Sequence, residues 1–298
     1  MKKWVVSNKS VIAAVLYGAV VIGGFTAYDQ YFADETEVVS AAQHDNNASH
    51  NASANNQPHE EAEQNGSSHG HESGSTHQGT SEVNVFVQSK AKEIKIFLKD
   101  KTGNPVHDLE INHEKLLHLI VVDEHLEKYY HLHPEQAGNG EFRVEHELPE
   151  GFYKAFVDIK PKHEAYHVAP VPFIVGNPSG TMDSHNEERK ADSNFTQSID
   201  GETVNMRMSS AQANQPVTLT FDLDQSKLAP YLGAMGHVVI LDEYAQNYLH
   251  VHPANEREPI FETEFTKPGI YKIWAEFKQN GKVRAFPFVV EIRGENEK

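Results

Sequence analysis

Two stretches of this chain repeat each other closely: HLIVVD (118–123) followed by YYHLHP (129–134), and HVVILD (237–242) followed by YLHVHP (248–253). Matched positions lie 119 residues apart, with no gap between the first histidine and the proline. Self-similarity at a fixed spacing indicates a duplicated structural unit. The chain therefore contains the same unit twice, and each copy carries three histidines at matching places.

The likeness extends outward from these stretches. GFYK (151–154) matches GIYK (269–272), and PFIV (172–175) matches PFVV (287–290). We therefore place the two repeats at 82–176 and 195–298, with a linker rich in Gly, Pro, Ser and Asp at 177–194.

Each repeat consists of short apolar runs separated by turn signals, such as TGNP (102–105) and KPG (267–269). Short runs of this kind, with no long amphipathic helical pattern, are typical of antiparallel β-structure. About seven short strands in roughly 95 residues indicate an immunoglobulin-like β-sandwich. The predicted fold class is all-β, with two tandem sandwich domains.

The N-terminal segment, 1–33, predicts a membrane anchor or a signal sequence. Lys2, Lys3 and Lys9 precede an uncharged stretch at 11–28, and acidic residues begin at Asp29. Its length is near the lower limit for a spanning helix and slightly above a usual signal-peptide core. The charge order places the N-terminus inside and the remainder outside the cell. The expected location is a single-pass protein of the cell membrane with extracytoplasmic domains, or a secreted protein if the segment is cleaved.

A polar spacer follows at 34–81, dominated by Asn, Ser, Gly, Glu and His. A segment of this composition buries too little apolar surface to offset its conformational entropy, so we expect disorder. Its histidines are His44, His50, His59, His69, His71 and His77. Two compatible interpretations remain: a solvated stalk, and a flexible tract that binds divalent cations loosely.

Composition excludes several classes of function. Acidic residues number 43 and basic residues 26, for a formal charge of −17, which disfavours nucleic-acid binding. The chain has no cysteine, which excludes disulfide scaffolds, thiolate metal sites and thiol catalysis. Catalytic triads, phosphate-binding loops and paired catalytic carboxylates do not stand out, so no enzyme is expected.

The repeated histidines predict a metal site. If residues 118–134 form a hairpin with His118 opposite His131 and a loop at 123–126, then His118, His131 and His133 project from one face. The same arithmetic groups His237, His250 and His252 in the second repeat, with a loop at 242–245. Three neutral imidazoles that converge suit Zn²⁺ or Cu²⁺.

The alternative is that these histidines only pack. The opposite face of the hairpin is apolar and is the natural core face; it carries Leu119, Val121, Tyr130 and Leu132. The histidine face also carries Ile120, Val122 and Tyr129, so half-buried histidines bonded to the backbone would fit as well. A slip of one residue in register would also separate the rings.

The quoted histidine stretches resemble those of a group of uncharacterised bacterial secreted or membrane-anchored proteins. YLGAMGHVV (231–239), GIYKIWAEF (269–277) and VRAFPF (283–288) resemble them too. The resemblance covers both repeats and excludes the anchor and the spacer. It implies an extracytoplasmic β-rich protein connected with heavy-metal handling.

Together these features predict a membrane-anchored, extracytoplasmic and non-enzymatic protein. Each repeat would hold one copper or zinc ion through three histidines, for metal buffering or delivery. The second hypothesis is a structural module of the cell envelope, with packing histidines and an envelope protein as its partner. A third is metal-assisted catalysis at an open coordination position.

Overall fold

The computed structural model describes residues 80–112, 114–179, 189–251 and 257–294. For residue 250 it describes the backbone but not the side chain. Residues 68–298 form one compact unit, which contains both repeats. The predicted membrane segment and almost all of the predicted spacer lie outside the described residues. Within the described ranges, no helix is long and apolar enough to cross a bilayer.

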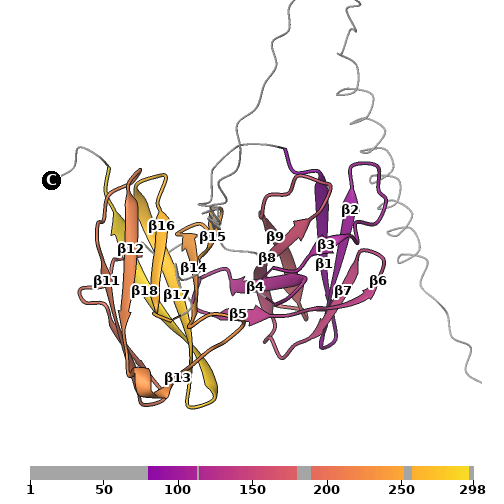
Figure 1. The fold of residues 1–298 in the computed structure, drawn as a ribbon. Helices are drawn as coiled ribbons and strands as arrows, with labels where there is room; N and C mark the ends of the chain where they lie inside the picture. Colours follow the sequence, from indigo (N-terminus) through magenta and orange to yellow (C-terminus); the bar gives the residue numbers. More distant parts are fainter. Residues whose placement is uncertain (1–79, 113, 180–188, 252–256, 295–298) are drawn as a thin grey trace, which may run out of the picture. The chain divides into compact units, whose positions relative to one another are not determined.

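The first repeat is built from two antiparallel sheets (Figure 1). One sheet has the order β1-β2-β7-β6; in the other, β8 lies between β9 and β4, β4 also pairs with β5, and β3 pairs with the end of β8. The strands are β1 (Val83–Lys90), β2 (Glu93–Asp100), β3 (Leu109–Glu110), β4 (Leu117–Asp123), β5 (Tyr129–Leu132), β6 (Glu135–Gly138), β7 (Glu141–Glu145), β8 (Gly151–Pro161) and β9 (Pro170–Val175).

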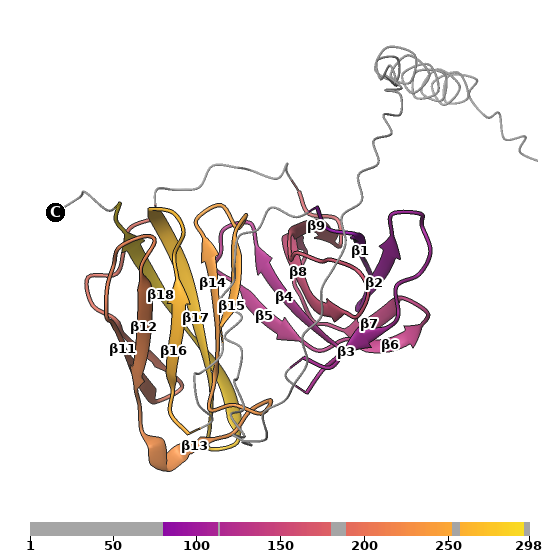
Figure 2. The same ribbon diagram turned by 45° about the horizontal axis from the view of Figure 1, so that its top comes forward.

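The second repeat uses the same plan, and its two layers can be followed in Figure 2. One sheet has the order β10-β11-β12-β16; in the other, β17 lies between β18 and β14, β14 also pairs with β15, and β13 pairs with the end of β17. The elements are β10 (Thr196–Ile199), β11 (Glu202–Met208), β12 (Pro216–Asp222), the short 3₁₀ turn η1 (Gln225–Lys227), β13 (Leu228–Ala229), β14 (His237–Asp242), β15 (Tyr248–Val251), β16 (Ile260–Glu264), β17 (Gly269–Gln279) and β18 (Lys282–Ile292).

Alternating side chains build a separate core inside each sandwich. In β2, Ile94, Ile96 and Leu98 all point inward and are buried, while the residues between them are less buried. Leu219 and Phe221 do the same in β12 of the second repeat. A period of two is what a strand with one buried face requires. The predicted all-β class, sandwich architecture and internal repeat are confirmed.

The strands β4 and β14 differ from this pattern because both of their faces are buried. All seven residues of β4 are buried, and so are the first five of β14. One face of each strand packs on its own core, and the other contributes to a third apolar cluster formed by both repeats. A strand covered on both faces has a nearly continuous apolar sequence. The runs IVV (120–122) in β4 and VVIL (238–241) in β14 are of this kind.

Candidate metal centre

The three histidines of the first repeat converge in the structure. His118, His131 and His133 each offer a ring nitrogen, and these three nitrogens lie within 4.8 Å of one another. The ring centroids of His131 and His133 are 4.7 Å apart, and that of His118 lies 5.2 and 5.1 Å from them. Among the described residues, these three form the one group of histidine or carboxylate side chains that lie close enough together to hold a metal ion.

The hairpin register differs from the prediction by two residues. Ile120, not His118, lies opposite His131, and Val122 lies opposite Tyr129. The loop causes the difference. The Asp123 carboxylate accepts hydrogen bonds from the backbone N–H groups of Glu127 and Lys128, so the loop extends over 123–128 and the strand pairing begins at Val122 and Tyr129. A shift of two preserves the alternation of faces, so the histidines still share one face.

The second repeat shows the same correction. Leu241 lies opposite Tyr248, and Val239 lies opposite the backbone of His250. Asp242 accepts hydrogen bonds from the backbone of Gln246 and Asn247, as Asp123 does from its own loop. The predicted loop at 242–245 is therefore wrong by the same two residues.

His118, the second residue of β4, is fully buried. Its Nε2 atom lies 3.0 Å from the carbonyl oxygen of Asn112, so this nitrogen carries the hydrogen and donates it. Its Nδ1 atom faces Nε2 of His131 at 3.0 Å. Burial lowers the pKa of His118 to about 4 and that of His133 to about 3, so both rings are neutral near pH 7. Neutral imidazole is the form that binds a metal ion.

His131 is held by a residue of the other repeat. Its Nδ1 atom lies 2.5 Å from a carboxylate oxygen of Glu276 in β17, and that carboxylate also accepts a hydrogen bond of 3.2 Å from the hydroxyl of Tyr129. The side chains of His131 and Glu276 are 1 % and 6 % exposed. The site is therefore buried and draws on both repeats.

Apolar packing between the repeats surrounds this contact. The third cluster joins corresponding faces of the sheets that contain β4 and β14, called here the two inner sheets. Its buried members are Ile120, Val122, Leu126, Phe156, Val239, Leu241, Ala245 and Trp274. The hydroxyl of Tyr248 donates to Asp158 at 3.3 Å, the counterpart of the bond from Tyr129 to Glu276. The histidine face that looked half-buried in the sequence is thus covered by the neighbouring repeat.

For the second repeat, the structure places one of the three predicted ligands. His237 is fully buried, and its Nε2 atom donates to the carbonyl oxygen of Tyr231 at 2.8 Å, as His118 does to Asn112. Burial lowers its pKa. Its ring centroid lies 6.1 Å from that of His131. His252 and the side chain of His250 lie outside the described residues.

Gly236 permits a close approach of two strands beside the site. A Cβ atom at this position would lie 2.6 Å from the ring of Phe277 and 2.8 Å from the carbonyl oxygen of Glu276. Contacts this short are repulsive, so a larger residue would displace β17 at Glu276. The absence of a side chain at Gly236 therefore helps to place the carboxylate that contacts His131.

The sequence interpretation missed Glu276 and its counterpart Asp158. The signal was present: GFYKAFVDI (151–159) and GIYKIWAEF (269–277) each carry one acidic residue in an otherwise apolar half of a strand. Asp158 lies opposite His118, and Glu276 lies opposite His237, in the same register. A lone carboxylate among buried residues calls for a specific partner.

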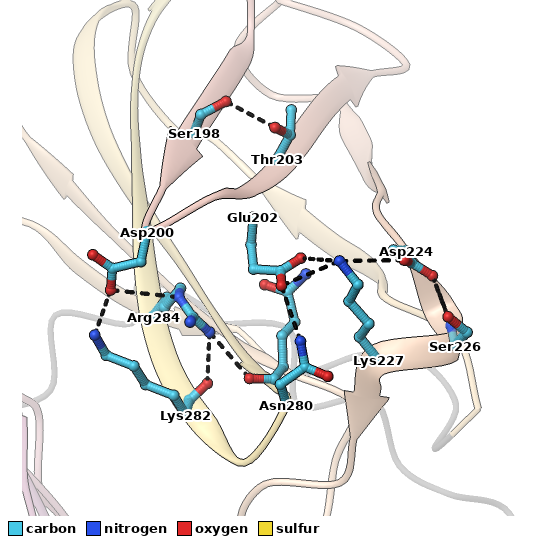
Figure 3. Close-up of polar contacts among 11 residues, drawn as sticks. Ser198, Asp200, Glu202, Thr203, Asp224, Ser226, Lys227, Asn280, Lys282 and Arg284 are labelled. Carbon is cyan, nitrogen blue, oxygen red and sulfur yellow. Dashed lines mark hydrogen bonds and ion pairs between the residues drawn. The ribbon is translucent and has the colours of Figure 1, made fainter.

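A second polar cluster lies around the β17–β18 turn of the second repeat (Figure 3). Glu202 is buried, and its carboxylate accepts hydrogen bonds from Lys227 and Asn280. Nearby, Asp200 pairs with Lys282. The acidic and basic groups of this cluster compensate one another, which indicates a structural network that fastens β11 and η1 to the β17–β18 turn.

Comparison with known proteins identifies a family. The model of a family described as "Domain of unknown function (DUF8832)" matches twice, at residues 61–176 and 197–294. No curated protein matches the chain.

Several solved structures show a likeness to this chain at low sequence identity. They include a tetra-tandem repeat from the extending region of a large adhesion protein (9 % identity, TM-score 0.24, 72 % of this chain and 50 % of that one). Another is the Escherichia coli adhesin FdeC (14 % identity, TM-score 0.21, 72 % of this chain and 65 % of that one). A third is a two-domain fibronectin type III segment of chicken tenascin (10 % identity, TM-score 0.21, 71 % of this chain and 99 % of that one). The chain spans half of the large adhesion protein segment and 65 % of the FdeC structure, and it spans almost all of the tenascin segment.

Proposed function

The chain belongs to the DUF8832 family, and we propose that it is a metal-binding protein in which His118, His131 and His133 hold one divalent transition-metal ion. Cu²⁺ and Zn²⁺ are the ions that suit three imidazoles. The proposed role is buffering or delivery of the ion, without catalysis.

The observation that carries the proposal is the 3.0 Å contact between Nδ1 of His118 and Nε2 of His131. The other nitrogen of each ring is committed as a donor, to the Asn112 carbonyl and to the Glu276 carboxylate. If each ring carries only this one hydrogen, the two facing nitrogens both present lone pairs in a buried place. Such an arrangement is repulsive unless a cation lies between the nitrogens.

A metal ion fits this arrangement better than a proton. A second hydrogen, on Nε2 of His131, could form a hydrogen bond to Nδ1 of His118, and the charged ring would pair with Glu276. It would give no partner to the ring of His133. The Nε2 atom of His133 is buried and has no hydrogen-bond partner in the described residues. Ligand nitrogens lie about 2.0–2.1 Å from Zn²⁺, so two of them on one ion are roughly 3.3 Å apart. The contact of 3.0 Å is close to this value.

Because the chain contains the same unit twice, the proposal extends to the second repeat and to the rest of the chain. We propose an equivalent site at His237, His250 and His252, immunoglobulin-like topology for both sandwiches, and an extracytoplasmic location behind a membrane segment at 1–33. The basic residues Lys2, Lys3 and Lys9 before an uncharged stretch support this location. The spacer histidines would hold ions loosely near the two sites, which raises the local concentration.

Metal retention tests the proposal. The full chain is loaded with Zn²⁺ or Cu²⁺, dialysed against metal-free buffer and analysed for bound metal. We expect about two equivalents, and the loss of one in His131→Ala. His163→Ala is the matched control, because the His163 side chain is 72 % exposed and lies outside the cluster.

Two results would contradict the proposal. One is a wild-type chain that retains no metal, and the other is a His131→Ala chain that retains as much as the wild type. A chain that binds no metal but loses stability on the same substitution would support the packing interpretation.

A further inference from the structure

We infer that Glu276 of the second repeat is a positioning residue for the metal site of the first repeat, so that metal binding and docking of the two repeats are coupled. The inference rests on the proposed function, because it concerns how that same site is regulated.

The carboxylate of Glu276 determines which nitrogen of His131 faces the site. It accepts the hydrogen on Nδ1, so the lone pair of the ring is on Nε2, and Nε2 is the atom that faces His118. The hydroxyl of Tyr129 donates to the same carboxylate oxygen and limits its movement. A carboxylate behind a ligand histidine fixes its tautomer and makes its free nitrogen a better donor to the metal.

The position of Glu276 depends in turn on the second repeat. Its strand, β17, pairs with β14, in which His237 lies opposite Glu276. Trp274, two residues earlier on the same face, stacks on the ring of Tyr129 with centroids 4.9 Å apart. Glu276 therefore reaches His131 only while the two inner sheets stay in contact.

Linkage makes the effect reciprocal. If contact between His131 and Glu276 strengthens metal binding by some factor, metal binding strengthens the contact by the same factor. Electron density that His131 gives to the metal also polarises its Nδ1–H group, which strengthens the hydrogen bond to the carboxylate. The ion thus acts as a clamp between the repeats, although its three ligands all come from the first.

The first test measures affinity for Zn²⁺ by chelator competition in the full chain. The variant Glu276→Gln keeps the size of the side chain and an acceptor oxygen but removes the charge. We expect its affinity at the first site to fall about 10- to 100-fold, the range known for carboxylates behind ligand histidines. Glu262→Gln is the matched control, since Glu262 is exposed on β16. An affinity of Glu276→Gln within twofold of wild type would overturn the inference.

The second test measures docking directly. The chain has no cysteine, so cysteines introduced at Lys90 and Glu264, which are exposed in the first and second repeat, take spin labels selectively. We expect the distribution of distances between the labels to narrow when Zn²⁺ is added to the wild-type sequence, and to narrow less in Glu276→Gln at equal occupancy. A distribution that zinc leaves unchanged would overturn the coupling.

Different results would contradict the proposed function and the role of Glu276. A wild-type chain that binds no metal would end the proposed function. A wild-type chain that binds metal through His131, but whose affinity and inter-repeat distances are indifferent to Glu276, would end only this inference.

Discussion

The ring of Tyr129 in the first repeat stacks on the ring of Trp274 in the second, with centroids 4.9 Å apart and planes inclined by 18°. The duplication produces this contact twice, because Phe156 and Tyr248 stack in the same way at 5.2 Å and 14°. Corresponding faces of two related sheets thus bury each other, as in the interface of a symmetric dimer. The candidate metal site lies beside this interface.

Trp274 is 2 % exposed and should contribute strongly to stability. We expect Trp274→Ala to lower the free energy of unfolding by about 3–5 kcal/mol, because it removes a large buried ring and leaves a cavity. Urea denaturation of the full chain measures the change. Tyr244→Ala, at a side chain 59 % exposed, should change it by no more than about 0.5 kcal/mol. Equal effects in the two variants would contradict the role given to the interface.

The hydroxyl of Tyr129 should matter both for stability and for the metal. Tyr129→Phe keeps the stacked ring but removes the donor to the Glu276 carboxylate, a charged acceptor. We expect a loss of about 1.5–3 kcal/mol in unfolding free energy, together with weaker Zn²⁺ binding. Tyr271→Phe is the control, because its hydroxyl donates to the backbone carbonyl of Lys267 and not to the Glu276 carboxylate. It should lower stability by about 1 kcal/mol and leave zinc affinity unchanged.

The metal-free protein should lose stability in weak acid. Burial lowers the pKa of His118 to about 4 in the folded protein, whereas an unfolded histidine titrates near 6.5. Between these values the unfolded chain binds more protons, so stability is complete above about pH 6.5 and falls as the pH decreases towards 4. Burial acts in the same direction on the pKa of His133.

Urea midpoints of the metal-free chain between pH 7.5 and pH 4.5 check this prediction. His118→Gln, which cannot titrate there, should show a shallower slope, by up to about 1.4 kcal/mol per pH unit. A slope equal to that of the wild type would show that this ring does not titrate as its burial requires. Metal should be released over the same range, because protons compete for the ligand nitrogens.

The network around Glu202 should stabilise the second repeat without affecting the metal. Its side chain is 10 % exposed and pairs with Lys227 at 3.0 Å. We expect Glu202→Ala to cost about 1–3 kcal/mol in unfolding free energy, since it removes buried charge-assisted hydrogen bonds. Glu147→Ala is the control, because Glu147 is 88 % exposed in its pair with Lys92 and should matter little. A loss of zinc affinity in Glu202→Ala would show that the two clusters communicate.

Several features of the fold and site could be predicted from the sequence because they depend on local pattern and on the duplication. Strand alternation was enough to place His118, His131 and His133 on one face and to assign Leu119 and Val121 to the core. The register was wrong because alternation has a period of two, so that a shift of two residues leaves every face unchanged. The hydrogen bonds of the Asp123 carboxylate and backbone within the loop favour the observed pairing.

The contact between the repeats could not be predicted in this way. Ile120 and Val122 on the histidine face indicated partial burial, but nothing in a single repeat shows that the other repeat covers them. The role of Glu276 follows from that packing, since 145 residues separate it from His131 in the chain. Its lone charge in an apolar strand was the available signal.

X-ray absorption of the zinc-loaded chain tests the central claim most directly. With the second site removed by His250→Ala and His252→Ala, the account predicts zinc bound by three imidazole nitrogens at about 2.0–2.1 Å, and the loss of this signature when His118 is also replaced by Ala. Zinc surrounded by oxygen ligands alone, or a spectrum that the replacement of His118 leaves unchanged, would contradict it.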